Sequence, residues 1–145
     1  MAHSKFYAFD ALAGVLKRDI GQAALTADGY VGTQWDQGAA VLTDGICIIN
    51  VETMKISAGN ETYKFRIIGS NAADRSDGEV LAMAEAGDAS TLATPETRDS
   101  AVGDRIEIRF RTEKNETKFR YIDLHLDVGG TSPSTQFSSY ISKEC

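Results

Sequence analysis

The chain has 145 residues and a mass of 15.7 kDa, which suits one domain with its own hydrophobic core. It carries 15 basic and 21 acidic residues, a formal net charge of −6. This acidic balance disfavours direct binding to nucleic-acid phosphates, because proteins that bind them gather lysine and arginine on one face. No stretch approaches the roughly 20 apolar residues that span a membrane. We therefore expect a globular protein that binds neither nucleic acid nor membrane.

The N-terminus and the cysteines bear on where the protein is made. The opening residues, MAHSKFYAFDALAG, lack the basic region and apolar core of a secretory signal, so we expect synthesis and retention in a cytoplasm. Cys47 and Cys145 do not have the spacing of metal ligands, and a disulfide scaffold is not expected. Cys47 lies among isoleucines, which predicts a buried structural thiol, whereas nothing in the sequence explains Cys145.

Residues 1–22 are predicted to form an N-terminal arm or a short helix. The stretch DALAGVLKRDI suits either a helix or an extended arm. Phe6, Tyr7 and Phe9 lie near the free end, and aromatic side chains are common anchors at protein interfaces. The arm therefore either binds a partner or folds back onto its own domain. Trp35, the only tryptophan, is a further candidate for an interface anchor, with core packing as the alternative.

From residue 45 onward, apolar residues alternate with polar ones, and Gly, Asp and Asn separate short runs. This period of two predicts an antiparallel all-β fold. The predicted strands cover residues 45–56, 62–69, 105–112, 119–128 and 135–142. Between them, residues 71–104 hold one apolar island that predicts a short strand or helical turn set between long loops. No low-complexity linker divides the chain, so residues 23–145 are predicted to form a single β-sandwich domain.

The stretch RYIDLHLDV places Asp123, His125 and Asp127 on one side of a strand and apolar side chains on the other. Such a row can be a metal site, an acid–base device or the polar face of a sheet. Residues 105–112 and 119–128 are joined by EKNETK, which is short enough for a β-hairpin. A register that keeps both apolar rows on one face then pairs Arg109 with Asp123, Glu107 with His125 and Arg105 with Asp127. We therefore interpret the row as the charge-matched polar face of this hairpin.

Motifs that carry enzymatic chemistry are missing from the sequence. There is no GxSxG, HExxH or Walker-type loop, and only two histidines are present. The acidic run Asp74, Asp77 and Glu79 does not have the spacing of an EF-hand loop. VGGTSPS resembles a phosphate loop only in its glycines, because the segment that follows it is predicted as a strand rather than a helix. We therefore expect a protein that is not an enzyme and holds no cofactor or metal.

The order of segments resembles that of the small capsid cement, or head decoration, proteins of tailed bacteriophages, and in particular the Bordetella-phage type. The segments are AALTADGYVGTQWDQGA, GICIINVETM, KFRIIGSNAADRSD, AVGDRIEIRF and KFRYIDLHLDVGGTSPS, followed by a closing strand. The resemblance covers residues 23–142. Its most specific part is RYIDLHLDV followed by GGTSPS.

The resemblance implies an antiparallel β-sandwich of jelly-roll type that assembles as a homotrimer. It implies a virion structural protein, assembled in the host cytoplasm, that sits on the capsid exterior and binds across subunits of the major capsid protein. Such proteins have no catalytic residues to carry over. A phage tail or baseplate component and a β-sandwich module that binds carbohydrate remain as alternatives.

Overall fold

The computed structural model describes residues 15–92 and 99–143, and all of its regular structure there is β-strand. The strands are β1 (Leu16–Arg18), β2 (Gly29–Asp36), β3 (Asp44–Met54), β4 (Thr62–Ser70), β5 (Glu79–Gly87), β6 (Arg105–Arg111), β7 (Glu113–Lys114), β8 (Thr117–Lys118), β9 (Tyr121–Gly129) and β10 (Thr135–Lys143). Phe6, Tyr7, Phe9 and Cys145 lie outside the described residues. Within the described ranges, no helix has the length and apolar character that crossing a membrane requires.

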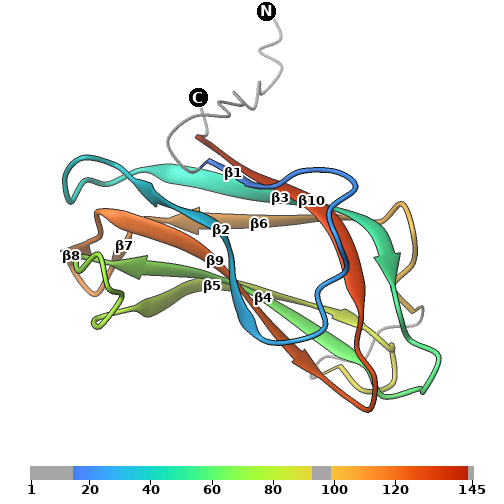
Figure 1. Cartoon of the computed structure of the whole chain (residues 1–145). Helices are drawn as coiled ribbons and strands as arrows, with labels where there is room; N and C mark the ends of the chain where they lie inside the picture. The colour runs from blue at the N-terminus through green and yellow to red at the C-terminus, as the bar shows by residue number, and fades with distance from the viewer. Residues whose placement is uncertain (1–14, 93–98, 144–145) are drawn as a thin grey trace, which may run out of the picture.

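Two four-stranded antiparallel sheets pack face to face (Figure 1). One has the strand order β1-β10-β3-β6 and the other has the order β2-β9-β4-β5. The β4–β5 hairpin stays within one sheet. Every other connection between consecutive strands of the two four-stranded sheets passes from one sheet to the other. This order is that of an eight-stranded jelly roll, and it confirms the predicted fold class.

The core lies between the sheets and follows from the alternation in the sequence. Buried residues come from every second position of β3, β4 and β9, among them Cys47, Ile49, Val51, Tyr63, Phe65, Ile67, Ile122, Leu124 and Leu126. Phe65 of one sheet meets Phe137 of the other edge to face, with ring centroids 5.2 Å apart. The Tyr63 hydroxyl donates to the Lys55 carbonyl at 2.6 Å, so this large aromatic residue is buried without an orphaned polar group.

The predicted hairpin between residues 105–112 and 119–128 is wrong. β6 pairs with β3, whereas β9 lies between β2 and β4 in the opposite sheet. Arg109, Glu107 and Arg105 therefore stand opposite Ile46, Ile48 and Asn50. Asp123, His125 and Asp127 stand opposite Ile68, Arg66 and Lys64.

The reason lies in the segment between the two strands. It forms its own small hairpin, β7–β8, whose two turn residues, Asn115 and Glu116, have φ angles of 50° and 67°. Two left-handed residues make the tight turn typical of two-residue hairpins. The chain crosses from one sheet to the other here, so the apolar rows of β6 and β9 enter the same core from opposite sheets instead of lying side by side in one sheet.

The predicted boundary at residue 22 also needs correction. Leu16–Arg18 is strand β1, an edge strand of the sandwich that pairs with β10. The last part of the predicted arm therefore belongs to the β-domain. The apolar island of residues 80–86 lies in strand β5, the outer strand of the other sheet.

Candidate functional site

The acidic row of β9 lies on the outer face of its sheet, and each aspartate has a local cationic partner. Asp123 is almost fully buried and accepts from Arg75 through Nε at 2.9 Å and Nη2 at 3.1 Å. The Gln34 amide donates to the same carboxylate at 3.0 Å. Asp127 pairs with Arg66 of the neighbouring strand at 3.1 Å. The row is charge-matched, but its partners are Arg75 and Arg66 rather than the arginines of β6.

Arg75 and the rings of this face form one packed cluster. The Arg75 guanidinium lies 4.2 Å from the centre of the Tyr30 ring, and Tyr30 meets His125 edge to face at 5.0 Å. Hydrogen bonding to Asp123 raises the pKa of Arg75, so this cation stays charged. Among the described residues, no three His, Cys, Asp or Glu side chains are placed to hold a metal ion.

Trp35 and Cys47 both belong to the core. Trp35 is 5% exposed, so its prediction as an interface anchor is wrong and the core alternative is correct. Cys47 is fully buried, as predicted, with its sulfur 3.4 Å from the Ser139 hydroxyl. Burial raises the pKa of the Cys47 thiol to about 11, which disfavours the thiolate that nucleophilic chemistry requires.

The acidic run after β4 stabilises its own loop. Asp77 accepts from the Ser70 hydroxyl and from the backbone amides of Asn71 and Ala72. These donors lower the pKa of Asp77. Asp74 accepts from the Ser76 amide at 3.0 Å. The two carboxylates thus organise the turn that presents Arg75 to Asp123.

Strand β1 carries the two most unusual side chains of the described chain. Its pairing with β10 contains an irregularity, because Leu16 pairs with Tyr140 while Arg18 pairs with Ser139. β1 therefore has one residue more than β10 across this step, which is a β-bulge. Lys17 and Arg18 are adjacent, yet both are buried, at 3% and 6% exposure. A regular strand would place such neighbours on opposite faces.

Lys17 crosses from β1 to the opposite sheet. Its ammonium group donates to the carbonyl of Thr33 on β2 at 2.8 Å and to the carbonyl of Ile122 on β9 at 3.2 Å. The register of β2 and β9 is irregular between Val31 and Trp35, which is where these carbonyls lie. Burial lowers the pKa of Lys17 to about 8, and the charge of Asp123 limits the decrease. Lys17 thus joins the two edge strands through a costly buried charge.

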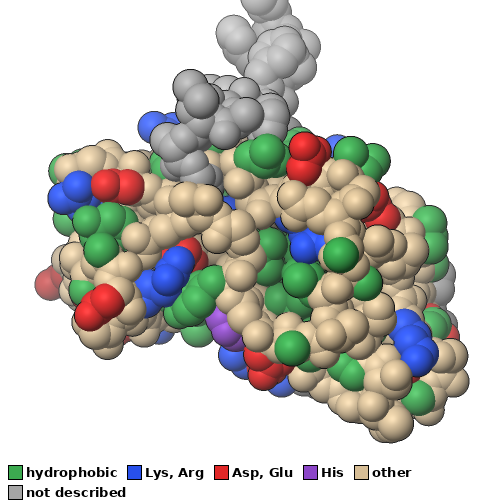
Figure 2. All heavy atoms as spheres, in the orientation of Figure 1, with side chains coloured by type: hydrophobic (Ala, Val, Ile, Leu, Met, Phe, Trp, Pro, Cys, Tyr) green, Lys and Arg blue, Asp and Glu red, His purple; other side chains and the backbone are tan. Residues whose placement is uncertain are grey.

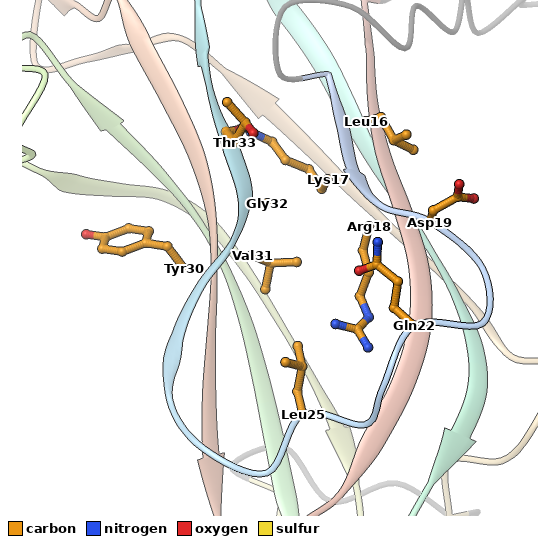
Figure 3. Close-up of a pocket in the computed structure, with 10 residues that line it drawn as sticks. All are labelled: Leu16, Lys17, Arg18, Asp19, Gln22, Leu25, Tyr30, Val31, Gly32 and Thr33. Atoms are coloured by element: carbon orange, nitrogen blue, oxygen red, sulfur yellow. The ribbon is translucent and has the colours of Figure 1, made fainter.

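A hollow opens beside these residues, between β1, β2 and the loop that joins them. Its volume is about 360 Å³. Leu16, Lys17, Arg18, Asp19, Gln22, Leu25, Tyr30, Val31, Gly32 and Thr33 line it (Figure 3). In Figure 2 a basic side chain lies in the depth of the hollow, with apolar side chains around it. We call this hollow the basic pocket and consider it as a binding site.

Sequence reasoning missed Lys17, Arg18 and Arg75. The pair Lys17–Arg18 lay within a stretch read as an arm or helix, and alternation gives no sign that both side chains point inward. Arg75 lies in a loop, where no periodic pattern indicates a partner. No local pattern in the sequence indicates that Arg75 is the partner of Asp123.

The comparisons with known proteins identify no family for this chain. No protein-family model matches the chain, and no curated protein matches it. Among solved structures, one match is to the CBM22-1 and GH10 modules of the N-terminal endo-1,4-β-D-xylanase 10B of Clostridium thermocellum, complexed with xylohexaose. This chain is similar to it at 11% identity and a TM-score of 0.40. The match covers 91% of this chain and 29% of that chain. A likeness at this level transfers no function.

Proposed function

We propose that the protein is a non-enzymatic virion structural protein that decorates a bacteriophage capsid by binding across subunits of the major capsid protein. The observation that carries the proposal is the strand order β1-β10-β3-β6 against β2-β9-β4-β5. This is the jelly roll that the resemblance to phage cement proteins implies.

The described side chains support a role as a brace. The ionisable groups of the β9 row are held in ion pairs and ring contacts, and Cys47 is buried with a raised pKa. A cement protein works by adding contacts across the seams between subunits, so it needs a rigid body and an exposed binding surface. The outer strand β5 exposes Val80 and Met83, at 41% and 51%, which are suitable apolar contacts for a neighbouring subunit.

Co-sedimentation tests the proposal. Capsids are assembled from the major capsid protein encoded in the same genome, incubated with the purified chain and pelleted. We expect saturable binding at a fixed ratio to capsid subunits, and a trimer when the mass of the free protein is measured in solution. A Met83→Glu variant should bind more weakly if β5 faces the capsid, whereas Ile20→Glu, the same kind of change at an apolar side chain that is 72% exposed and lies outside β5, serves as the control.

The same assay addresses the N-terminal segment. Deleting residues 2–14 removes Phe6, Tyr7 and Phe9, and a loss of capsid binding by a folded deletion variant would support their role as interface anchors. A chain that never pellets with capsids and is strictly monomeric would contradict the proposed function. Binding to polysaccharide columns would favour a carbohydrate-binding module. Recovery with purified tails instead of heads would favour a tail or baseplate component.

A further inference from the structure

The basic pocket between β1 and β2 holds two buried cations with different surroundings. The Lys17 ammonium has two carbonyl partners in the opposite sheet, at 2.8 and 3.2 Å. Arg18 is nearly as buried, at 6% exposure, but its guanidinium does not reach that sheet's carbonyls. In Figure 3 it projects from β1 into the space beside Leu25. The Lys17 ammonium is thus held by hydrogen bonds to the opposite sheet, whereas the Arg18 guanidinium faces the hollow.

Arg18 has fewer partners than a buried guanidinium requires. One Nη donates to the Ala23 carbonyl, and the group lies 5.3 Å from the centre of the Phe137 ring. Among the described residues its Nε has no hydrogen-bond partner, and the same is true of the buried Oε2 atom of Glu52. Within residues 15–92 and 99–143, no carboxylate forms an ion pair with it, although Glu52 is near enough to stabilise its charge. Burying a charge is costly unless it is paired and hydrogen-bonded, so an unpaired Nε–H calls for an acceptor.

The hollow has the size and lining of a small-ligand site. Its volume of about 360 Å³ falls within the range of roughly 300 to 1,000 Å³ that is usual for ligand pockets. Leu25 and Val31 supply apolar wall, and Gln22 adds a polar amide to the lining. The charged residues of the lining are Lys17, Arg18 and Asp19, so the lining is net positive in a chain of net charge −6. The nearby Glu52 carboxylate offsets part of this charge, so a ligand with a single negative charge suits the pocket better than one with several.

We propose that this pocket binds a carboxylate group, with one carboxylate oxygen accepting from the free Nε–H of Arg18. A planar carboxylate matches the guanidinium, and charge-assisted hydrogen bonds of this kind are the strong ones. The carboxylate can belong to a small sugar acid or to an acidic side chain of a bound polypeptide. The inference does not depend on the proposed capsid role.

A purely structural role for the two cations makes a different prediction. Charged side chains that point inward from an edge strand prevent that strand from pairing with another chain. If this were their only role, the pocket would take up no carboxylate.

The experiment uses the full-length chain labelled with nitrogen-15 and follows the Arg18 Nε–Hε resonance by NMR. Acetate and acetamide serve as probes of nearly equal shape that differ in charge. We expect acetate to shift the Arg18 Nε–Hε resonance and amides of the pocket lining, with an affinity at least about tenfold greater than that of acetamide. Equal shifts from acetate and acetamide, shifts remote from the pocket, or no shift with acetate would overturn the proposal.

Two further arms strengthen the test. Glucuronate represents a sugar acid, and N-acetylglutamate α-amide represents an acidic side chain of a polypeptide. Tighter binding of one of them identifies the class of ligand, and equal binding supports a site that recognises the carboxylate alone. Arg18→Gln should abolish the acetate shifts, whereas Arg111→Gln, at an exposed arginine paired with Asp44, should retain them. If Arg18→Gln does not fold, the comparison of acetate with acetamide on the wild-type chain still decides the question. Retained acetate binding by a folded Arg18→Gln variant would contradict the assignment.

Discussion

The substitution Lys17→Met tests whether a buried ammonium group joins the two edge strands. Met has a similar length and no charge, so it removes the hydrogen bonds to the carbonyls of Thr33 and Ile122 and also removes the cost of burying the ammonium. Each lost hydrogen bond to a charged group costs about 1.5 to 3 kcal/mol. Removing a buried charge compensates for much of that loss. The stability at one pH is therefore a poor test, and its dependence on pH is a better one.

The magnitude follows from the pKa of Lys17, which is about 8 in the folded protein against an ordinary value of 10.5. One pKa unit corresponds to about 1.4 kcal/mol, so folding makes protonation of Lys17 less favourable by about 3 kcal/mol. Between these two pKa values the unfolded chain binds more protons than the folded protein. The free energy of unfolding therefore rises with pH in this window. The expected rise is about 1 kcal/mol between about pH 8 and pH 9.

Cys47 limits this rise at higher pH. Its thiol has a pKa of about 11 when folded, against an ordinary value of 9.0. The unfolded chain therefore loses the thiol proton first, and stability falls as pH rises from about 9 to 11. By pH 9 half of this thiol is ionised in the unfolded chain, which subtracts about 0.4 kcal/mol from the rise due to Lys17, so the Lys17 effect is the larger one below pH 9 and the two effects nearly cancel above it.

The assay is urea denaturation at a series of pH values from about 7 to 9, followed by tryptophan fluorescence of Trp35. We expect the wild-type free energy of unfolding to rise over this range and that of Lys17→Met to lack this rise. Lys55→Met is a matched control, because it removes an exposed lysine that donates to Ser132, and it should keep the wild-type slope. An equal slope in wild type and Lys17→Met would refute the reasoning.

Three other substitutions test the packing of the site and of the crossover. Arg75→Met leaves the buried Asp123 carboxylate without its cation and should lower the free energy of unfolding by about 3 to 5 kcal/mol. In a double-mutant cycle, adding Asp123→Asn to Arg75→Met should recover part of this loss. Gly32→Ala introduces a Cβ that overlaps the Lys17 carbonyl at a φ of +73°, so calorimetry should show a lower Tm, with a loss of at least about 2 kcal/mol. Glu116→Gly relieves a left-handed residue in the β7–β8 turn and should raise stability by about 1 kcal/mol; a lower Tm would contradict the turn geometry.

The strands themselves were predictable because alternation is a local property. The run predicted at 45–56 is β3, Asp44–Met54, and the run predicted at 135–142 is β10, Thr135–Lys143. Both strands bury the row that faces the other sheet, as alternation predicts, and β3 buries Ile46 and Ile48 of its second row as well. The burial of Cys47 followed from the same local pattern.

Strand pairing was not predictable from the same pattern. Two neighbouring strands in one sheet and two strands in opposite sheets of a sandwich both turn an apolar row toward the core. β6 and β9 lie in opposite sheets, and the register argument that paired Arg109 with Asp123 could not distinguish this arrangement from a hairpin. The actual partner of Asp123 comes from a loop 48 positions earlier, and sequence spacing carries no information about such a contact.

By itself, the sequence determined that this protein is an all-β domain and which side chains its strands bury, because burial follows a period that neighbouring residues set. Only the tertiary structure decided which strands meet, how the β1 bulge turns both Lys17 and Arg18 inward, and which cation neutralises Asp123. These depend on contacts between distant segments. Their free energy exists only once both sheets have formed and water has been excluded between them.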